Sequence, residues 1–381
     1  MTGQFALTED QLAIQEMAQR FTADNITPFA AEWDDKSHFP RDVIQQTGEL
    51  GFGAIYVSEE SGGINLGRLE AALIMEAMAY GCPTTSAYIS IHNMAAWMID
   101  RFGSDELKAR YLPSLVTMEH LASYALTEPG SGSDAAGLKT SAVLDGDHYV
   151  LNGTKQFISG AGFNDIYVVM VRTGEHKSKG ITCLVIEKDT PGLSFGKPEK
   201  KLGWNASPTA QLIFEDCRVS VANRVGAEGE GFSFAMAGLD GGRLNIGACS
   251  LGGAQRCLDE AVKYTKERKQ FDTPVADFQN TQFMLADMAT ELEAARALLY
   301  LAAAKVTENA PDKTRFSAMA KRLATDSGSN VVNNALQLFG GYGYLKEYPI
   351  ERYWRDLRVH SILEGTNQVM RMIVGRDLLR Q

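Results

Sequence analysis

Hydrophobic and polar positions change their period twice along the chain. From Thr8 to about Leu121, apolar residues recur at helical spacing. Between about Leu121 and Gly231 the apolar runs become short and rich in β-branched and aromatic residues, and from about Gly231 helical spacing returns. The pattern predicts an α+β multidomain protein: an N-terminal α-helical domain (1–120), a middle antiparallel β-barrel or β-sandwich domain (121–230) and a C-terminal helical-bundle domain (231–381).

Capping and stop residues mark the helices that are predicted in the first domain. Residues 8–11, Thr-Glu-Asp-Gln, have the spacing of a capping box. Further helices are predicted at 40–50 and 66–80, the second of which is stopped by Gly81 and Pro83.

Turn residues divide the middle third into strands. Residues 139–144 and 148–151 flank Asp145-Gly146 and predict a hairpin, and Asn152-Gly153 predicts a second tight turn directly after it. Short spacing of this kind is typical of a small antiparallel barrel or sandwich. Further strands are predicted at 166–171, 181–186 and 211–214.

The last third reads as long amphipathic helices rich in Ala and Leu. Their lengths suit a helical bundle. The predicted helices are 232–269, 277–308, 313–339 and 367–379.

Charge and cysteine usage exclude several classes of protein. The chain has 381 residues and a formal net charge of −10, which argues against a nucleic-acid-binding surface. Its five cysteines form no C-x-x-C pair, which indicates free thiols in a reducing compartment, and no Cys or His cluster has metal-ligand spacing, so we predict no metal site.

Targeting signals are also missing from the sequence. Residues 1–5 lack the features of a secretory signal, and no apolar run approaches the roughly 18 residues that span a bilayer. We therefore expect a soluble intracellular protein without membrane insertion, either cytoplasmic in a bacterium or the mature mitochondrial-matrix form, without transit peptide, in a eukaryote.

A carboxylate near the C-terminus is the first candidate for chemistry. Glu364 follows the apolar pair Ile362-Leu363, and Gly365 and Thr366 follow it, with Thr366 placed to cap the last helix. An apolar wall raises the pKa of a carboxyl, as a proton abstractor at neutral pH requires. The alternative is that Glu364 only stabilises the helix dipole.

Two loops in the middle third could bind a ligand. Residues 124–134 alternate glycines with hydroxyl side chains, an arrangement that forms anion-binding nests, although a surface loop would have the same composition. Phe157 beside Ser159 could flank a planar cofactor or belong to the core. Gly160-Ala161-Gly162 does not continue into a dinucleotide-binding fingerprint, and no G-x-S-x-G elbow occurs.

The last third holds two further candidates. Arg268 and Lys269 end a predicted helix, where they either stabilise its dipole or bind a pyrophosphate. Asp240-Gly241-Gly242-Arg243 places two glycines inside a helix at a cost of roughly 1 kcal/mol each relative to Ala, which could make room for a ligand.

Taken together, these segments resemble the acyl-CoA dehydrogenase family. The shared motifs occur in the family's order and span the chain: Y-A-L-T-E-P-G-S-G-S-D at 124–134, F-I-S at 157–159, E-R-K-Q-F at 267–271, Q-L-F-G-G at 337–341 and E-G-T-N-Q at 364–368. Three other stretches are similar to the isobutyryl-CoA-specific members of the family: A-E-W-D at 31–34, A-Y-I-S-I-H-N-M-A-A-W-M-I-D at 87–100 and G-Y-G-Y-L-K at 341–346.

The resemblance implies an FAD-dependent homotetramer, a dimer of dimers, that desaturates an acyl-CoA and passes electrons to electron-transferring flavoprotein. It implies that Glu364 removes the α-proton while the flavin takes the β-hydride. It further implies that FAD is bound at subunit interfaces, in part by a neighbouring subunit, by residues Tyr124, Leu126, Thr127, Gly132, Ser133, Phe157, Ile158, Ser159, Arg268, Gln270, Phe278, Gln279, Gln337, Leu338, Gly340, Gly341, Gly365, Thr366, Asn367 and Gln368. The substrate residues that it implies are Ser133, Asp240, Arg243, Glu364 and Gly365.

Two departures from the family pattern bear on these expectations. Many relatives carry Trp where this chain has Phe157, which reduces the stacking area. Some relatives place the base on the helix that here contains Gly242, which leaves Glu364 as the candidate.

The substrate expected is a short branched-chain acyl-CoA, isobutyryl-CoA, which would become methacrylyl-CoA in valine breakdown. The alternatives are butyryl-CoA or 2-methylbutyryl-CoA, an oxidase that reduces oxygen directly, and a non-catalytic flavin- or acyl-CoA-binding protein.

Overall fold

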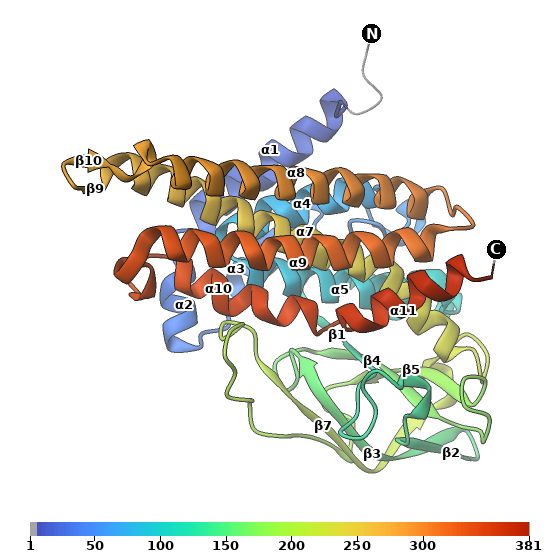
Figure 1. Cartoon of the computed structure of the whole chain (residues 1–381). Helices are drawn as coiled ribbons and strands as arrows, with labels where there is room; N and C mark the ends of the chain where they lie inside the picture. The colour runs from blue at the N-terminus through green and yellow to red at the C-terminus, as the bar shows by residue number, and fades with distance from the viewer. Residues whose placement is uncertain (1–5, 381) are drawn as a thin grey trace.

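The computed structural model describes residues 6–380. The expectation about a secretory signal rests on residues 1–5, which lie outside the described residues. The chain builds a large helical part and a β domain that lies against one side of it, at the bottom of Figure 1. Within residues 6–380, no helix is long and apolar enough to cross a membrane.

Within the described residues, six α-helices precede the β domain. Thr8 caps the first of them with a complete capping box, as predicted. Pro83, predicted as part of a helix stop, instead occupies the first turn of the next helix, where its missing N–H costs no hydrogen bond. The helices are α1 (Glu9–Asn25), α2 (Ala30–Lys36), α3 (Arg41–Gln46), α4 (Arg68–Gly81), α5 (Pro83–Phe102) and α6 (Asp105–Val116).

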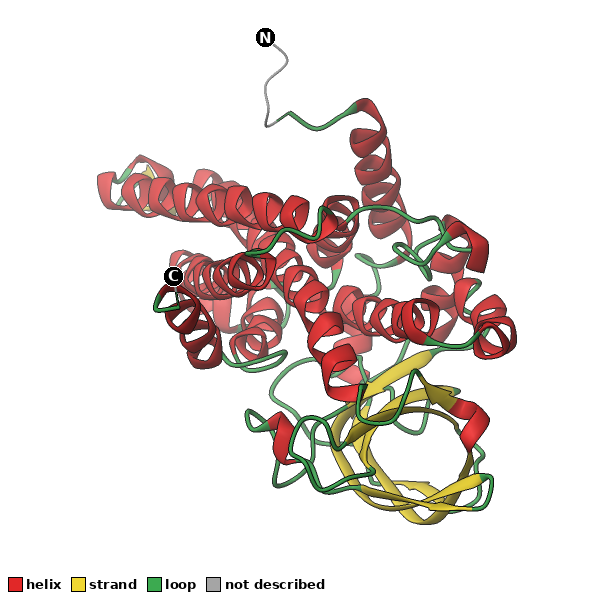
Figure 2. Ribbon diagram, turned by 90° about the vertical axis from the view of Figure 1, so that its right-hand side faces the viewer, coloured by secondary structure: helices red, strands yellow, loops and turns green. Residues whose placement is uncertain are grey.

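The strands of the middle third form one strongly curved sheet, seen nearly end-on in Figure 2. Its order is β6-β7-β3-β2-β4-β5-β8, with β1 beside β4. Most neighbours are antiparallel, but β1 runs parallel to β4, and one residue pair joins β2 and β4 in parallel. The strands are β1 (Ala122–Ala125), β2 (Ser141–Asp145), β3 (His148–Ser159), β4 (Ile166–Arg172), β5 (Ile181–Glu187), β6 (Leu193–Phe195), β7 (Thr209–Ser220) and β8 (Arg224–Val225).

One predicted turn in this sheet is wrong. The hairpin at Asp145-Gly146 is confirmed, but β3 continues through Asn152-Gly153 as a single strand. The register with β7 shifts between Leu151 and Gly153, which marks a bulge. A side chain at Gly153 would lie 2.7 Å from the Thr140 backbone, so this glycine permits close approach of the backbone and does not reverse the chain.

Five α-helices complete the described part of the chain, and the four that were predicted agree with the structure to within about two residues. They are α7 (Gly231–Glu267), α8 (Gln279–Thr307), α9 (Lys313–Phe339), α10 (Ile350–Arg358) and α11 (Asn367–Leu378), and a small ribbon of β9 (Lys269–Gln270) and β10 (Thr273–Pro274) lies between α7 and α8. The helix α10 was not predicted. These features confirm the fold class of helical, β and helical segments.

The N-terminal and C-terminal helices share one hydrophobic core. Ile74 and Met78 of α4 belong to the same buried cluster as Leu244 and Leu251 of α7. The helices of the two ends of the chain therefore form a continuous packed layer, and α7 crosses its centre in Figure 1.

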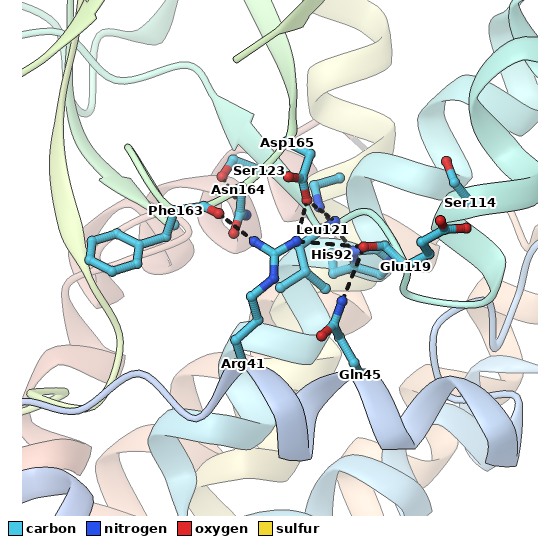
Figure 3. Close-up of polar contacts among 12 residues, drawn as sticks. Arg41, Gln45, His92, Ser114, Glu119, Leu121, Ser123, Phe163, Asn164 and Asp165 are labelled. Atoms are coloured by element: carbon cyan, nitrogen blue, oxygen red, sulfur yellow. Dashed lines mark hydrogen bonds and ion pairs between the residues drawn. The ribbon is translucent and has the colours of Figure 1, made fainter. Parts of the chain in front are cut away.

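Arg41 holds the β domain to the helical layer (Figure 3). Its guanidinium donates to the Phe163 carbonyl and to Oδ2 of Asp165, each at 2.7 Å. The same Asp165 oxygen accepts from the Leu121 backbone N–H at 2.8 Å. The start of β1, the loop before β4 and the helix α3 are thereby joined through one carboxylate.

All five cysteines are free and buried. Burial raises the pKa of Cys217 to about 11 and that of Cys249 to about 12, and it raises the pKa of Cys82, Cys183 and Cys257 as well. The thiols are therefore protonated at neutral pH.

Candidate active site

A cavity of about 710 Å³ opens where the β domain meets the helices. Its size is in the usual range for cofactor and ligand sites. The loop after β1, the end of β3, the helix α7 and the segment between α10 and α11 all contribute to its wall. Eleven of the residues predicted to form the site line it: Tyr124, Leu126, Thr127, Gly132, Ser133, Phe157, Ile158, Ser159, Arg243, Glu364 and Gly365.

Glu364 stands in a tight turn between α10 and α11. Both Glu364 and Gly365 have positive φ, +52° and +88°, and Thr366 then caps α11 by accepting from the Val369 N–H. A left-handed conformation is unfavourable for a residue with a side chain, so the surrounding structure must hold Glu364 in it. The turn points the carboxylate into the cavity.

The Glu364 carboxylate is half-buried, and its Oε2 has no hydrogen-bond partner among the described residues. Burial raises the pKa of Glu364 to about 7, against the opposing influence of Arg243 and Lys321. A carboxyl with such a pKa and a free oxygen is suited to exchange a proton with a ligand near neutral pH.

Gly242 of α7 makes room for this carboxylate. A side chain at Gly242 would place its Cβ 2.4 Å from Oε2 of Glu364. Gly242 and Glu364 therefore lie next to each other in this fold. We predicted that the glycine pair leaves space for a ligand. In the structure, Gly242 instead leaves space for the Glu364 side chain.

Arg243 lies at the cavity wall, and its positive charge is balanced by Asp240. Its guanidinium bonds Oδ1 of Asp240 at 2.8 Å, and its Nε donates to the Glu364 carbonyl at 3.4 Å. Asp240 itself does not line the cavity; its other oxygen accepts from Thr314 at 2.7 Å. The structure thus places Asp240 behind Arg243.

The loop 124–134 is built around a buried ion pair. Lys155 of β3 has a fully buried side chain whose Nζ bonds Glu128 at 2.8 Å and the Leu126 carbonyl at 3.1 Å. Glu128 also accepts from the backbone N–H groups of Lys139 and Thr140. A Cβ at Gly132 would meet no atom within 4 Å, so the loop leaves open space towards the cavity.

An aromatic side chain faces the cavity from the end of β3. Phe157 has φ of +58° and is 63 % exposed, a large value for an aromatic ring on a cavity wall. Beside it, the Ser123 hydroxyl donates to the Ser159 carbonyl at 2.6 Å. The Asn164 side chain donates to the same Ser123 hydroxyl at 2.8 Å. Hydrogen bonds from neighbouring segments therefore fix this strand end.

A second hollow of about 460 Å³ lies at the ribbon end of α7 and α9. It brings together six of the predicted residues: Arg268, Gln270, Gln337, Leu338, Gly340 and Gly341. Phe278 and Gln279, at the start of α8, line neither hollow.

The predicted residues Thr366, Asn367 and Gln368 support α11 and do not line the cavity. Thr366 is its cap, Gln368 is exposed, and Asn367 is buried, where it bonds Thr325 at 2.9 Å and Asp326 at 2.7 Å.

Several cations at the cavity were not singled out from the sequence. They are Lys201, Arg355, Arg358 and Arg376. Arg355 and Arg358 stand three residues apart in α10, and Arg376 lies in the last turn of α11. The helical spacing of Arg355 and Arg358 could have indicated that they share one face of a helix. This signal was missed because α10 itself was not predicted.

Comparison with known proteins gives full-length matches. Family models described as the N-terminal, middle and C-terminal domains of acyl-CoA dehydrogenase match residues 8–119, 123–217 and 229–379. The chain is 58 % identical to a mitochondrial isobutyryl-CoA dehydrogenase of Dictyostelium discoideum and 55 % identical to that of Bos taurus; each alignment covers 98 % of this chain and 90 % of the relative. The structure of butyryl-CoA dehydrogenase from Megasphaera elsdenii superposes with a TM-score of 0.96 at 39 % identity, over 99 % of this chain and 100 % of that one.

Proposed function

The chain belongs to the acyl-CoA dehydrogenase family and is an FAD-dependent oxidoreductase that dehydrogenates acyl-CoA, and we propose that its substrate is isobutyryl-CoA. The product would be methacrylyl-CoA, in valine breakdown. The support for this substrate is the similarity over nearly the whole chain to two proteins named for isobutyryl-CoA.

The residues at the cavity fit the cofactor. The largely exposed Phe157 ring offers an apolar surface on the cavity wall, and the open space beside Gly132 lies on the same cavity. We propose that the loop 124–133 and residues 157–159 bind FAD in this cavity. When bound, FAD supplies the acceptor for the β-hydride.

Glu364 is the proposed base. Its free Oε2 and raised pKa suit it to take the α-proton of the thioester, and the apolar cavity keeps water from solvating the carboxylate. Ser133, Arg243 and Gly365 line the same cavity and are proposed to contact the substrate, with Asp240 holding Arg243 in place. The unpartnered carboxylate in the cavity is the observation that carries the proposal.

An anaerobic mixing experiment tests reaction and substrate together. Isobutyryl-CoA, butyryl-CoA and 2-methylbutyryl-CoA are each added to the holoenzyme, and flavin absorbance is followed. We expect rapid bleaching by all three and the highest rate with isobutyryl-CoA. A clear preference for butyryl-CoA would refute the proposal that isobutyryl-CoA is the substrate. Unchanged absorbance with all three would indicate a non-catalytic binding protein.

Replacing the base tests the role of Glu364. Glu364→Gln should retain FAD and bind acyl-CoA, but lose turnover by at least about 100-fold, the lower end of what a positioned base contributes. Glu347→Gln, a change at an exposed carboxylate, is the matched control. Near-normal rates in Glu364→Gln would remove Glu364 from the mechanism.

We further propose that electrons pass to electron-transferring flavoprotein and that the protein is a homotetramer. In this tetramer, the FAD of a neighbouring subunit would be bound by Arg268, Gln270, Phe278, Gln279 and the segment 337–341. The subunit's own FAD would lie against residues 365–368. The position of the second hollow at the far end of α7 and α9 supports this division of roles. Mass measurement in solution tests the tetramer, and hydrogen peroxide yield under air distinguishes a dehydrogenase from an oxidase.

We also propose a domain division and a cellular location. The domain division is proposed as 1–120, 121–230 and 231–381. The location is proposed as the cytoplasm or, in a eukaryote, the mitochondrial matrix; the names of both relatives carry the word mitochondrial.

A further inference from the structure

Lys321 is a buried cation directly behind the Glu364 turn. It lies on α9, its side chain is 0 % exposed, and it does not line the cavity. Its Nζ donates to the Gly365 carbonyl at 2.9 Å and to Oδ1 of Asn367 at 3.0 Å. A lysine in such a place is uncommon, because burying an ammonium group is costly unless its charge is used.

The two carbonyls of the left-handed turn are each held by a cation. Arg243 from α7 reaches the Glu364 carbonyl, and Lys321 from α9 reaches that of Gly365. Neither cation bonds the Glu364 carboxylate. The turn is thus fixed through its backbone while the carboxylate forms no ion pair, whereas a direct ion pair would occupy the lone pair that a base needs.

The two cations differ in how their charge is balanced. Arg243 forms an ion pair with Asp240 at 2.8 Å. Lys321 forms no ion pair with any acid in the described part of the chain, and among nearby acids Glu364 acts on it most strongly. Burial lowers the pKa of Lys321 to about 8, which still leaves it largely charged at neutral pH.

Other titratable groups also face this turn, so their contribution must be distinguished from that of Lys321. Asp326 accepts a hydrogen bond from Asn367, the residue to which Lys321 also donates. Burial lowers the pKa of His360 to about 3, so this histidine is neutral. The remaining charged or titratable groups that act on the carboxylate are Arg243 with Asp240, Tyr56, Tyr124 and Cys249. Tyrosine and cysteine stay neutral there because burial raises their pKa values.

We propose that Lys321 is a positioning residue for proton abstraction: it anchors the Gly365 carbonyl from inside the bundle, and its charge favours the ionised form of Glu364. The proposal rests on the proposed role of Glu364. Lys321 contacts neither substrate nor cofactor and acts only through the turn that it holds. Its contribution is therefore to the orientation and ionisation of the base, and not to binding of acyl-CoA.

Two substitutions separate the anchor from the charge. Lys321→Met removes both, and Lys321→Gln removes the charge but keeps a hydrogen-bond donor. For Lys321→Met we expect a fall in kcat of about 10- to 100-fold with KM changed less than about threefold, since misplacing a reacting group by about 1 Å costs that much. Lys321→Gln should keep more of kcat. Lys263→Met, at an exposed lysine of α7, is the control and should match the wild type.

The pH profile gives a readout that a purely structural role would not change. In both variants the rising limb of kcat/KM should move to higher pH by roughly 0.5–1.5 units, because the loss of a nearby positive charge disfavours the carboxylate. Rates of flavin bleaching in a single turnover, measured over the same pH range, should show the same displacement.

The outcomes are distinguishable. If the wild type bleaches with acyl-CoA but both variants keep its kcat and its pH midpoint, the role of Lys321 is refuted while the proposed function stands. A lowered melting temperature with an unchanged midpoint would show a merely structural lysine and would also refute it. If Lys321→Met does not fold, the midpoint of Lys321→Gln decides. A wild type that fails to bleach with every acyl-CoA overturns the proposed function instead.

Discussion

The ionisation of Glu364 gives the activity a defined pH dependence. Burial raises the pKa of this carboxyl above its ordinary value to about 7, so the basic form is lost as pH falls through that value. We expect kcat/KM to increase with pH up to a plateau above about 7. A profile that is already flat at pH 5–6 would contradict the assignment of Glu364 as base.

The space left by Gly242 is predicted to be required for activity. A Cβ there would approach Oε2 of Glu364 to 2.4 Å, so Gly242→Ala must displace the carboxylate. We expect kcat to fall at least about tenfold, although alanine favours the helix by about 1 kcal/mol.

The control for this substitution is Gly375→Ala in α11. A Cβ at Gly375 meets no atom within 4 Å, so only the gain in helix propensity remains. Thermal unfolding should show that both variants fold. Equal activity of Gly242→Ala and Gly375→Ala would mean that the carboxylate has room to move.

For single residues, the sequence predicted which side chains surround Glu364 but not the backbone conformation of its turn. The Thr366 cap and the apolar flank of Glu364 follow from local chemistry and are confirmed. The left-handed turn at Glu364 was not predicted, because it is held by Arg243 and Lys321, which lie more than 40 residues away in sequence.

Among elements, the loop 124–134 depends on the pair formed by Lys155 and Glu128. Removing one partner leaves the other charge buried without its counterion, which costs about 3–5 kcal/mol. Lys155→Met should therefore lower the melting temperature and weaken FAD retention, whereas the double change Lys155→Met with Glu128→Gln should recover part of the loss.

Melting temperature and bound flavin are measured together for this prediction. Lys139→Met, at an exposed neighbour, is the control and should match the wild type. Glu128→Gln is measured alone as well. If the loss in the double variant equals the sum of the losses in Lys155→Met and Glu128→Gln, the two residues act independently.

Elements were predicted best where a long periodic pattern determines them. The boundaries of α9 were predicted from its sequence, whereas the Asn152-Gly153 turn was wrong because a turn-forming pair also suits a bulge inside a paired strand. Which of the two forms depends on the partner strand β7, and that partner is distant in the chain.

For the whole molecule, the Arg41–Asp165 contact is predicted to hold the β domain in place. Asp165→Ala removes acceptors for Arg41 and for the Leu121 N–H, and hydrogen bonds of this kind contribute about 1–3 kcal/mol. We expect the melting temperature to fall by about 2–5 °C and proteolysis near residue 121 to accelerate.

An exposed ion pair within the β domain supplies the comparison. Asp145→Ala removes the partner of Arg218, and since both side chains are largely exposed the effect should be close to zero. A similar loss in both variants would argue that Asp165 has no special role between the two parts.

The order of helical, β and helical segments was predictable, but their assembly was not. Periodicity indicates that a helix face is buried without indicating which surface covers it, and here α4 is covered by α7 from the other end of the chain. The cavity arises at the meeting of these distant segments, which explains why Arg355 and Arg358 were missed.

The buried thiols make the protein a convenient subject for site-directed labelling. Because all five native cysteines are buried and protonated, a maleimide dye should react slowly with the folded chain. A single cysteine introduced on the surface, for example in place of the exposed Lys263, would then carry one fluorophore without removal of any native thiol. Such a label would allow the proposed homotetramer and the proposed docking of electron-transferring flavoprotein to be tested by energy transfer.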